Sequence, residues 1–317
     1  MADITTIIFG ATGGVGSATA RAAHQQGAKV VLALRDPRKQ ISGFTPEQER
    51  AAGIERVRAD FSDPETVARA VRETRAKRAF IYALLGQTPD FLRTSITALK
   101  DAGVEFVVLL SSAGVQGDIR SVPATQFVPF AHAQVEISLD EVFGPGAYVA
   151  VRPGYFASNA LWWKGMVRDG EVKTIYPEAT ADWITPGDIG RVCGSLLVAG
   201  PEAIAMENAV ELYGPELVSF KEAVQIIGSA VGKEIQVTQL DEEAGVQWYT
   251  KELGMPAPMA RDLVDVFKAN AERSDREDGY YSGSAYSEAV ANVQKYGGRR
   301  PRTFKEWVEE NKHEFNA

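Results

Sequence analysis

Short apolar runs alternate with helix-like segments through the first half of the chain. This alternation is typical of a parallel sheet whose strands are joined by helices on both of its faces. The pattern therefore predicts an α/β fold with a doubly wound parallel sheet. It places strands over residues 4–9, 29–34, 54–58, 79–83, 104–110 and 147–151, and helices over residues 14–26, 64–74, 89–102 and 129–143.

Two prolines mark helix starts in this pattern. Pro64 and Pro89 each fit the first position of a helix, where the missing N–H costs nothing. Asp63, directly before Pro64, fits the N-cap.

The pattern becomes looser and more aromatic after residue 151, as in a region that covers a ligand. The aromatic residues are Tyr155, Phe156, Trp162, Trp163, Tyr176 and Trp183. Further on we expect a helix from Pro186, a strand over 209–212, a helix over 220–231, a strand over 234–240, then mostly helix, with a surface loop over 279–283. The chain thus divides into a nucleotide-binding domain over 1–153, with 184–200 packing back on it, and a smaller substrate-binding region over 154–317.

Composition narrows the function classes. The 317 residues are 45% hydrophobic and 24% charged, which is ordinary for a soluble enzyme. A net charge of −8 argues against a nucleic-acid partner. The single cysteine, Cys193, fits a buried position in a reducing compartment. With neither a basic leader nor an apolar run long enough to cross a bilayer, we expect a cytoplasmic protein without a membrane partner.

A glycine-rich turn follows the first predicted strand and leads into the first helix. Such a turn presents backbone N–H groups to a phosphate, and the second strand arrives at the spacing of a dinucleotide-binding βαβ unit. The glycines allow a tight turn, an open approach to the diphosphate and close helix–strand packing, while Thr12 and Val15 are expected against the phosphates. The predicted diphosphate contacts are Gly10, Thr12, Gly13, Gly14 and Val15, with Gly16 completing the pattern. The alternative is an ordinary glycine-rich turn.

Arg35 ends the second strand, where a side chain faces the adenosine ribose of a bound dinucleotide. An arginine there favours a 2′-phosphate, so we expect NADP(H) in preference to NAD(H). Arg38 and Lys39 add positive charge nearby, whereas Asp36 opposes it. The alternative is a solvated arginine.

Residues after the third and fourth strands are further cofactor candidates, because ligands lie beyond the carboxyl ends of parallel strands. Asp60 and Phe61 are expected beside the adenine, and Leu84 and Leu85 beside the nicotinamide ribose. A helix cap is the alternative role of Asp60.

Several segments together resemble the NmrA-like group of atypical short-chain dehydrogenases/reductases, which includes quinone and triphenylmethane reductases. The resemblance covers nearly the whole chain and rests on residues 10–16, 34–37, 132 with 136, 151–159, 185–190 and 302–307. It implies a Rossmann domain that binds NADP(H), with Pro153, Tyr155 and Phe156 also meeting the cofactor. The resemblance also leaves two functions open, because the group contains both reductases and regulators that sense the dinucleotide. Some of these reductases act in natural-product biosynthesis.

The proton-donating tyrosine of typical short-chain dehydrogenases is missing. Their Tyr-x-x-x-Lys pair lies on the helix after the fifth strand, and alignment on that helix puts Val128 at the tyrosine and His132 at the lysine. His132 is therefore the catalytic candidate, orienting the cofactor or shuttling a proton, with Glu136 one turn away on the same face. The alternative is a histidine bonded to a backbone carbonyl.

Substrate contacts are expected from residues near the same strand ends. Ser111 and Ser112 end the fifth strand, where the wider superfamily keeps a substrate-binding serine, and we favour Ser112. Tyr155 is the nearest phenol, although packing against Phe156 is its favoured role. Trp162 and Trp163 fit either a pocket wall or the core.

Without a dedicated proton donor, the chemistry favours an acceptor that stabilises its own developing charge. The sequence thus predicts an NADPH-dependent reductase acting on a conjugated or aromatic carbonyl compound, and a monomer or homodimer. The rival hypothesis is a non-catalytic NADP(H) sensor that binds a protein partner. A third, an isomerase, would need acid and base groups on both sides of the nicotinamide. Three histidines and one cysteine form no recognisable metal site.

Overall fold

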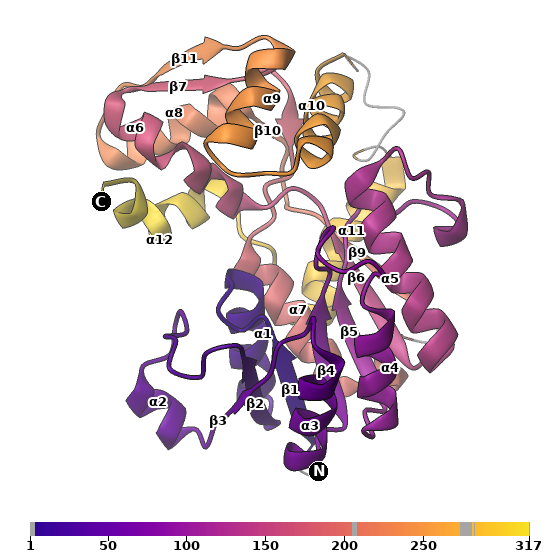
Figure 1. Cartoon of the computed structure of the whole chain (residues 1–317). Helices are drawn as coiled ribbons and strands as arrows, with labels where there is room; N and C mark the ends of the chain where they lie inside the picture. The colour runs from indigo at the N-terminus through magenta and orange to yellow at the C-terminus, as the bar shows by residue number, and fades with distance from the viewer. Residues whose placement is uncertain (1–3, 205–207, 273–280, 282, 317) are drawn as a thin grey trace.

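The computed structural model of the protein describes residues 4–204, 208–272, 281 and 283–316. Figure 1 shows a large unit built on one sheet, with a second group of helices and short strands lying over one end of it. In the described part, no helix has the length and apolar character needed to cross a membrane.

The large unit is built on a seven-stranded parallel sheet with the strand order β3-β2-β1-β4-β5-β6-β9. The order reverses between β1 and β4, which is the Rossmann arrangement, and the α/β prediction is confirmed. Register is regular, with Ile7 of β1 opposite Val31 of β2. The strands are β1 (Thr5–Phe9), β2 (Lys29–Leu34), β3 (Glu55–Arg58), β4 (Arg78–Tyr82), β5 (Phe106–Leu110), β6 (Tyr148–Pro153) and β9 (Ala209–Leu212).

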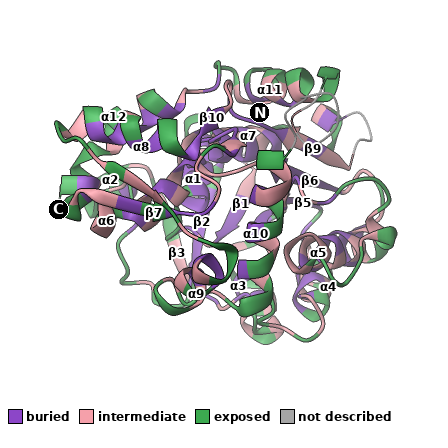
Figure 2. Cartoon of the chain, turned by 90° about the horizontal axis from the view of Figure 1, so that it is seen from above, coloured by how far each residue is buried: buried purple, intermediate pink, exposed green. Residues whose placement is uncertain are grey.

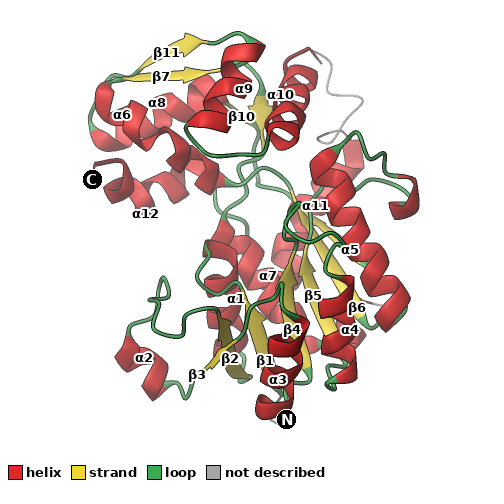
Figure 3. Ribbon diagram, in the orientation of Figure 1, coloured by secondary structure: helices red, strands yellow, loops and turns green. Residues whose placement is uncertain are grey.

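Helices cover both faces of this sheet, which is why its strands are apolar along their whole length. Ile8 and Leu32 point into the core under one face, and Ile7 and Val31 into the core under the other. The first face carries α1 (Gly14–Gln25), α7 (Pro186–Ala199) and α11 (Gly283–Gly297); the second carries α3 (Pro64–Thr74), α4 (Arg93–Asp101) and α5 (Phe127–Phe143). Short α2 (Pro46–Ala51) lies beside the edge of the sheet that β3 forms (Figure 3).

Helix α7 packs closely on α1 because two glycines remove the side chains between them. A Cβ on Gly194 would lie 2.6 Å from the Cβ of Ala22, and one on Gly190 would overlap Ala18. The sheet unit also includes β9 and α11, which the sequence-based division assigned to the smaller region. β9 pairs with β6 and α11 packs on α7. Both are long-range contacts, which the local sequence pattern cannot predict.

The second unit encloses an aromatic core of its own, in which Trp183, Phe220, Phe267 and Phe304 are buried. Two small sheets, β8 with β10 and β7 with β11, lie within it. Its elements are α6 (Lys164–Asp169), β7 (Glu171–Thr174), β8 (Thr180–Ala181), β10 (Val218–Ser219), α8 (Phe220–Val231), β11 (Gln236–Gln239), α9 (Glu242–Lys251), α10 (Ala257–Glu272) and α12 (Phe304–Asn316). Figure 2 shows both cores as buried segments beneath exposed outer helix faces.

Two helix starts differ from their predictions: α5 begins at Phe127, two residues early, and α4 begins late. Asp63 caps α3 as expected, but α4 begins at Arg93 and Pro89 lies outside it. Phe91 and Leu92 have φ values of 48° and 67°, a left-handed conformation that cannot continue an α-helix. The Asp90 carboxylate accepts the N–H groups of Leu92 and Thr94, so it begins the helix in place of the proline.

Candidate functional site

The N-terminus of α1 carries no side-chain cap. Its N-cap residue is Gly13, and no acidic residue lies in its first turn. By contrast, Asp63 caps α3 and Ser219 caps α8. The α1 terminus thus offers backbone N–H groups and the positive end of the helix dipole to an anion.

The glycines of this turn leave room for such an anion. Gly10 adopts φ +71°, and its carbonyl oxygen accepts the N–H of Gly13. A Cβ on Gly16 would overlap that same oxygen, so helix and strand could not approach as they do. A Cβ on Gly13 would meet one atom within 4 Å, the Gly10 oxygen at 3.4 Å, and otherwise open space. The turn therefore fits a diphosphate.

The other residues of the turn divide into exposed and buried. Thr12 and Gly14 are exposed beside Gly13, as expected of phosphate contacts. Val15 belongs to the core between α1 and the sheet, so only its backbone N–H is available to a ligand.

Arg35 lies exposed at the end of β2, beside the predicted adenosine site. Asp36, which opposed the NADP(H) prediction, is paired with Arg38, whose Nε lies 3.0 Å from Asp36 Oδ1. Hydrogen bonds from Arg38 lower the pKa of the Asp36 carboxyl, which keeps it ionised within this pair. The charge of Asp36 is therefore balanced locally by Arg38.

The structure bears differently on the two third-strand candidates. Asp60 is not a helix cap, because Asp63 caps α3; the Asp60 carboxylate accepts the backbone N–H and hydroxyl of Ser62. Phe61 is only 3% exposed, and its ring packs on Phe9 with the centroids 4.7 Å apart. The side chain of Phe61 therefore belongs to the sheet core and cannot stack on an adenine.

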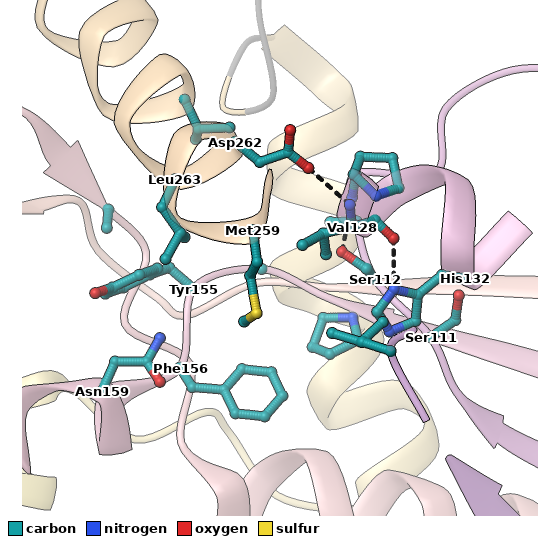
Figure 4. A pocket seen from close by; sticks show the side chains of 18 of the residues that line it. Ser111, Ser112, Val128, His132, Tyr155, Phe156, Asn159, Met259, Asp262 and Leu263 are labelled. Atoms are coloured by element: carbon teal, nitrogen blue, oxygen red, sulfur yellow. Dashed lines mark hydrogen bonds between the residues drawn. The ribbon is translucent and has the colours of Figure 1, made fainter. Parts of the chain in front are cut away.

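A cavity of about 380 Å³ lies beyond the carboxyl ends of β4, β5 and β6, and α10 of the second unit closes it on one side (Figure 4). This is where the nicotinamide end of a dinucleotide bound at the α1 terminus would reach. The lining is mainly apolar and aromatic. From the candidate set it includes Leu85, Ser111, Ser112, His132, Pro153, Tyr155, Phe156 and Trp162.

Two candidates point elsewhere. Leu84 packs against the sheet core next to the cavity. Trp163 is 4% exposed and lies in the core of the second unit, against Trp183 and Phe220, so its prediction as a substrate contact is wrong.

His132 lies on α5 at the cavity wall, and its Nδ1 is 2.9 Å from the carbonyl oxygen of Val128 (Figure 4). A carbonyl only accepts, so Nδ1 carries the proton and Nε2 is a hydrogen-bond acceptor when the ring is neutral. Burial lowers the pKa of His132, opposed by the Val128 bond and Glu136. The backbone-bonded alternative thus describes one nitrogen, and the other remains available to a ligand.

Glu136 does not work with His132 as an acid–base pair. Its Oε1 accepts the Ser111 hydroxyl at 2.6 Å, and Arg152 donates to both carboxylate oxygens, with Nη2 2.5 Å from Oε2. All three side chains are buried, so Ser111 is committed to this network. Ser112 faces the cavity, with its oxygen accepting the N–H of Gly114.

We expect His132 to make stability fall in mild acid. Its lowered folded-state pKa means that the unfolded chain binds the extra proton more readily, so the contribution is full above the unfolded pKa of about 6.5 and falls as pH drops below it. Urea unfolding of wild type and His132→Gln at pH 8 and pH 5 should show the smaller acid loss in the variant. Equal losses in wild type and variant would contradict a lowered pKa of His132 in the folded protein.

Tyr155 lines the cavity but packs differently from its prediction. Its ring contacts Trp162, Trp183, Phe220 and Phe267 edge-on, not Phe156, which packs on the sheet core. Burial raises the pKa of the phenol well above its usual value, which makes it a weak proton donor. Tyr155 therefore serves as a wall between cavity and aromatic core.

Comparison with known proteins shows which family the chain belongs to. A family model described as NAD(P)H-binding matches residues 10–173. The chain is 38% identical over 320 residues to the nitrogen metabolite regulation-like protein bik4 of Gibberella fujikuroi, covering 95% of this chain and 94% of that protein. The chain belongs to the NmrA-like family.

Three further proteins are similar to this chain over nearly its full length. A (4-alkanoyl-5-oxo-2,5-dihydrofuran-3-yl)methyl phosphate reductase of Streptomyces griseus is 26% identical, with 98% of each chain covered. The fold matches quinone oxidoreductase QOR2 of Escherichia coli complexed with NADPH, at TM-score 0.72, 18% identity and coverage of 97% and 99%. It also matches the negative transcriptional regulator NmrA in complex with NAD, at TM-score 0.69, 16% identity and coverage of 97% and 95%. The chain thus carries an NAD(P)H-binding domain of reductase-like fold.

Sequence reasoning missed two parts of the site in this NmrA-like protein. Met259, Asp262 and Leu263 of α10 roof the cavity, although nothing in their spacing marks them as a ligand wall. Tyr281, expected in a surface loop, also lines the cavity, and its hydroxyl donates to Asp182 at 2.9 Å. Three other residues of that predicted loop, 279, 280 and 282, lie outside the described residues.

Asp182 anchors this corner of the site. It accepts the N–H groups of Tyr155 and Gly214 as well as the Tyr281 hydroxyl. Burial raises its pKa to about 6, against the opposing effect of these hydrogen bonds. The carboxyl thus joins the ends of β6 and β9 to a cavity wall.

Proposed function

We propose that this protein is an NADPH-dependent reductase that transfers a hydride to a conjugated or aromatic carbonyl compound of the quinone or enone type. The observation that carries the proposal is the walled, mainly apolar cavity beyond β4, β5 and β6. A pocket that holds a flat apolar acceptor beside a nicotinamide is what such a reductase requires, whereas a sensor needs no substrate cavity.

The residues of the site suit a bound NADPH, which would supply the hydride. The uncapped α1 terminus would hold the diphosphate, and Arg35 the 2′-phosphate of the adenosine. On the nicotinamide side, Pro153 and Phe156 form walls and Nε2 of His132 would accept a hydrogen bond from the ribose.

The lining favours acceptors that need no protein acid. Val128 stands at the tyrosine position, His132 presents an acceptor nitrogen, and burial makes Tyr155 a weak acid. A quinone or enone spreads the developing charge over its own conjugated system and can take its proton from water. The protein would then act by positioning the acceptor and excluding water from it. Two relatives are named as reductases of compounds of this kind, a quinone and an oxo-dihydrofuran.

A direct test incubates the purified protein with NADPH and a panel of quinones and enones, while absorbance near 340 nm, roughly the band of the reduced nicotinamide, is followed. We expect NADPH oxidation that depends on the acceptor and saturates with its concentration. Tight NADPH binding with no turnover of any acceptor would reject the reductase.

Arg35 is expected to select NADP(H). Replacing it in Arg35→Ala should weaken NADPH binding by about tenfold or more, since a charge-assisted contact to phosphate contributes roughly 1.5–3 kcal/mol, and leave NADH binding nearly unchanged. Calorimetric titration of both nucleotides measures the ratio. Arg38→Ala is the matched control, because that guanidinium is already paired with Asp36. An unchanged NADPH-to-NADH ratio in Arg35→Ala would show that Arg35 does not read the phosphate.

The second candidate is a non-catalytic regulator that binds NADP(H) and a protein partner. It is favoured by the valine at position 128 and by the relative named as nitrogen metabolite regulation-like. The acceptor panel separates the two proposals, because a regulator binds the nucleotide without consuming it.

A further inference from the structure

Among the described residues that line the cavity, the only formal charge is a negative one, on the side formed by α10. The single carboxylate is Asp262 of α10, and none of these described residues is a lysine or an arginine. The other polar members are neutral amides, hydroxyls and the imidazole of His132, whose pKa is lowered by burial.

Asp262 is held in place by a contact across the two units. Its Oδ2 accepts the N–H of Val128 at 2.7 Å, in the first turn of α5, where Gln126 provides no side-chain cap (Figure 4). Backbone N–H donors orient the carboxylate but carry no net charge, so its negative charge persists at the cavity wall.

The cations of α10 are engaged elsewhere. Arg261 faces Glu243 at 4.0 Å, and Lys268 donates to Glu242 at 2.9 Å. Asp265, one turn along from Arg261, adds a further negative charge on the exposed side of the helix. The roof of the cavity is therefore electrostatically negative on the side where a substrate would lie against it.

An anionic substrate would meet two costs in this cavity. Its charge would leave water for an apolar, aromatic wall, and it would approach a like charge with little solvent between them. A positively charged substituent would meet the opposite situation, because the carboxylate and the faces of aromatic rings such as Trp162 both attract cations.

We propose that Asp262 sets the charge specificity of the substrate pocket, so that acceptors bearing a positive charge are preferred to neutral ones and anionic acceptors are excluded. This inference rests on the proposed function for its choice of acceptor. It separates this chain from its relative named for a phosphate ester, since a phosphate would need a cation that the described wall does not offer.

The test uses three matched naphthoquinones: the unsubstituted ring, the ring with a sulfonate and the ring with a trimethylammonium group. Their dissociation constants are measured on protein loaded with NADP⁺ by quenching of tryptophan fluorescence, because Trp162 lies in the wall. Burial raises the pKa of Asp262, helped by Asp265 and opposed by the N–H groups of Val128 and Phe127, so the assay is run at pH 8. We expect the cationic ring to bind at least about tenfold more tightly than the anionic one.

Asp262→Asn isolates the charge, because the amide oxygen can still accept the Val128 N–H. In this variant the preference for the cation should shrink to about twofold or less. Asp265→Asn, which removes a charge from the exposed side of the same helix, should keep most of it. Equal affinities for the three rings in wild type, or a preference that survives Asp262→Asn, would overturn the inference. Turnover with NADPH is recorded separately, so that bound but unreduced rings would count against the reductase and not against the charge preference.

Discussion

Gly13→Asp is expected to abolish NADPH binding while leaving the fold at least as stable as wild type. Gly13 has φ −86° and ψ 161°, which any residue adopts, and a Cβ there meets only the Gly10 oxygen at 3.4 Å. A carboxylate at this N-cap would accept the free N–H groups of α1 and stabilise it by about 0.3 kcal/mol relative to glycine. The same carboxylate would occupy the diphosphate position with like charge, so affinity should fall by about a hundredfold or more.

Calorimetric titration with NADPH and urea unfolding together measure this effect. Gly13→Ala is the control, because it adds the Cβ without the charge and should lose far less affinity. The combination of lost binding and preserved stability distinguishes a blocked ligand site from a misfolded protein. Wild-type affinity in Gly13→Asp would mean that the diphosphate does not lie at the α1 terminus.

Arg152→Ala is expected to destabilise the protein by about 3–5 kcal/mol. Removing this side chain leaves the buried carboxylate of Glu136 with the Ser111 hydroxyl alone, and an uncompensated buried charge is costly. Urea unfolding at neutral pH provides the measurement. NADPH binding should weaken as well, because the pair ties α5, which carries His132, to β6.

The double variant Glu136→Gln with Arg152→Met is the matched comparison. It removes both charges and keeps similar volumes, so it should lose clearly less stability than Arg152→Ala. A loss of less than about 1 kcal/mol in unfolding free energy for Arg152→Ala would mean that water or another group compensates the charge of Glu136. The network would then not anchor α5.

This network shows how far the site of this NmrA-like protein departs from typical short-chain dehydrogenases. The helix position one turn from His132 looked like a catalytic partner in the sequence, since residues four apart share a helix face. In the structure Glu136 is bonded to Arg152 and to Ser111, which also lines the cavity. What remains at the cavity is a neutral imidazole with an acceptor nitrogen, which suits orienting a cofactor better than donating a proton.

The amino-acid sequence by itself determined the parts of the protein that depend on neighbours in the chain. The apolar strand runs, the cap at Asp63 and the glycine turn at residues 10–16 all follow from local periodicity and backbone freedom, and the structure has them where they were expected. The position of Arg35 could be predicted for the same reason, because this residue directly follows β2.

Only the tertiary structure decided which side chains line the cavity. It turned Phe61 and Trp163 into their cores, drew Glu136 to Arg152, and brought α10 with Asp262 over the ends of β4, β5 and β6. These outcomes depend on contacts between different elements of the fold, which are 16 residues apart for Glu136 with Arg152 and 134 residues apart for Asp262 with Val128. The local sequence pattern determines whether a segment forms a helix or a strand and how that element is capped. Which residues each face of the element contacts depends on packing and on charge compensation across the whole chain.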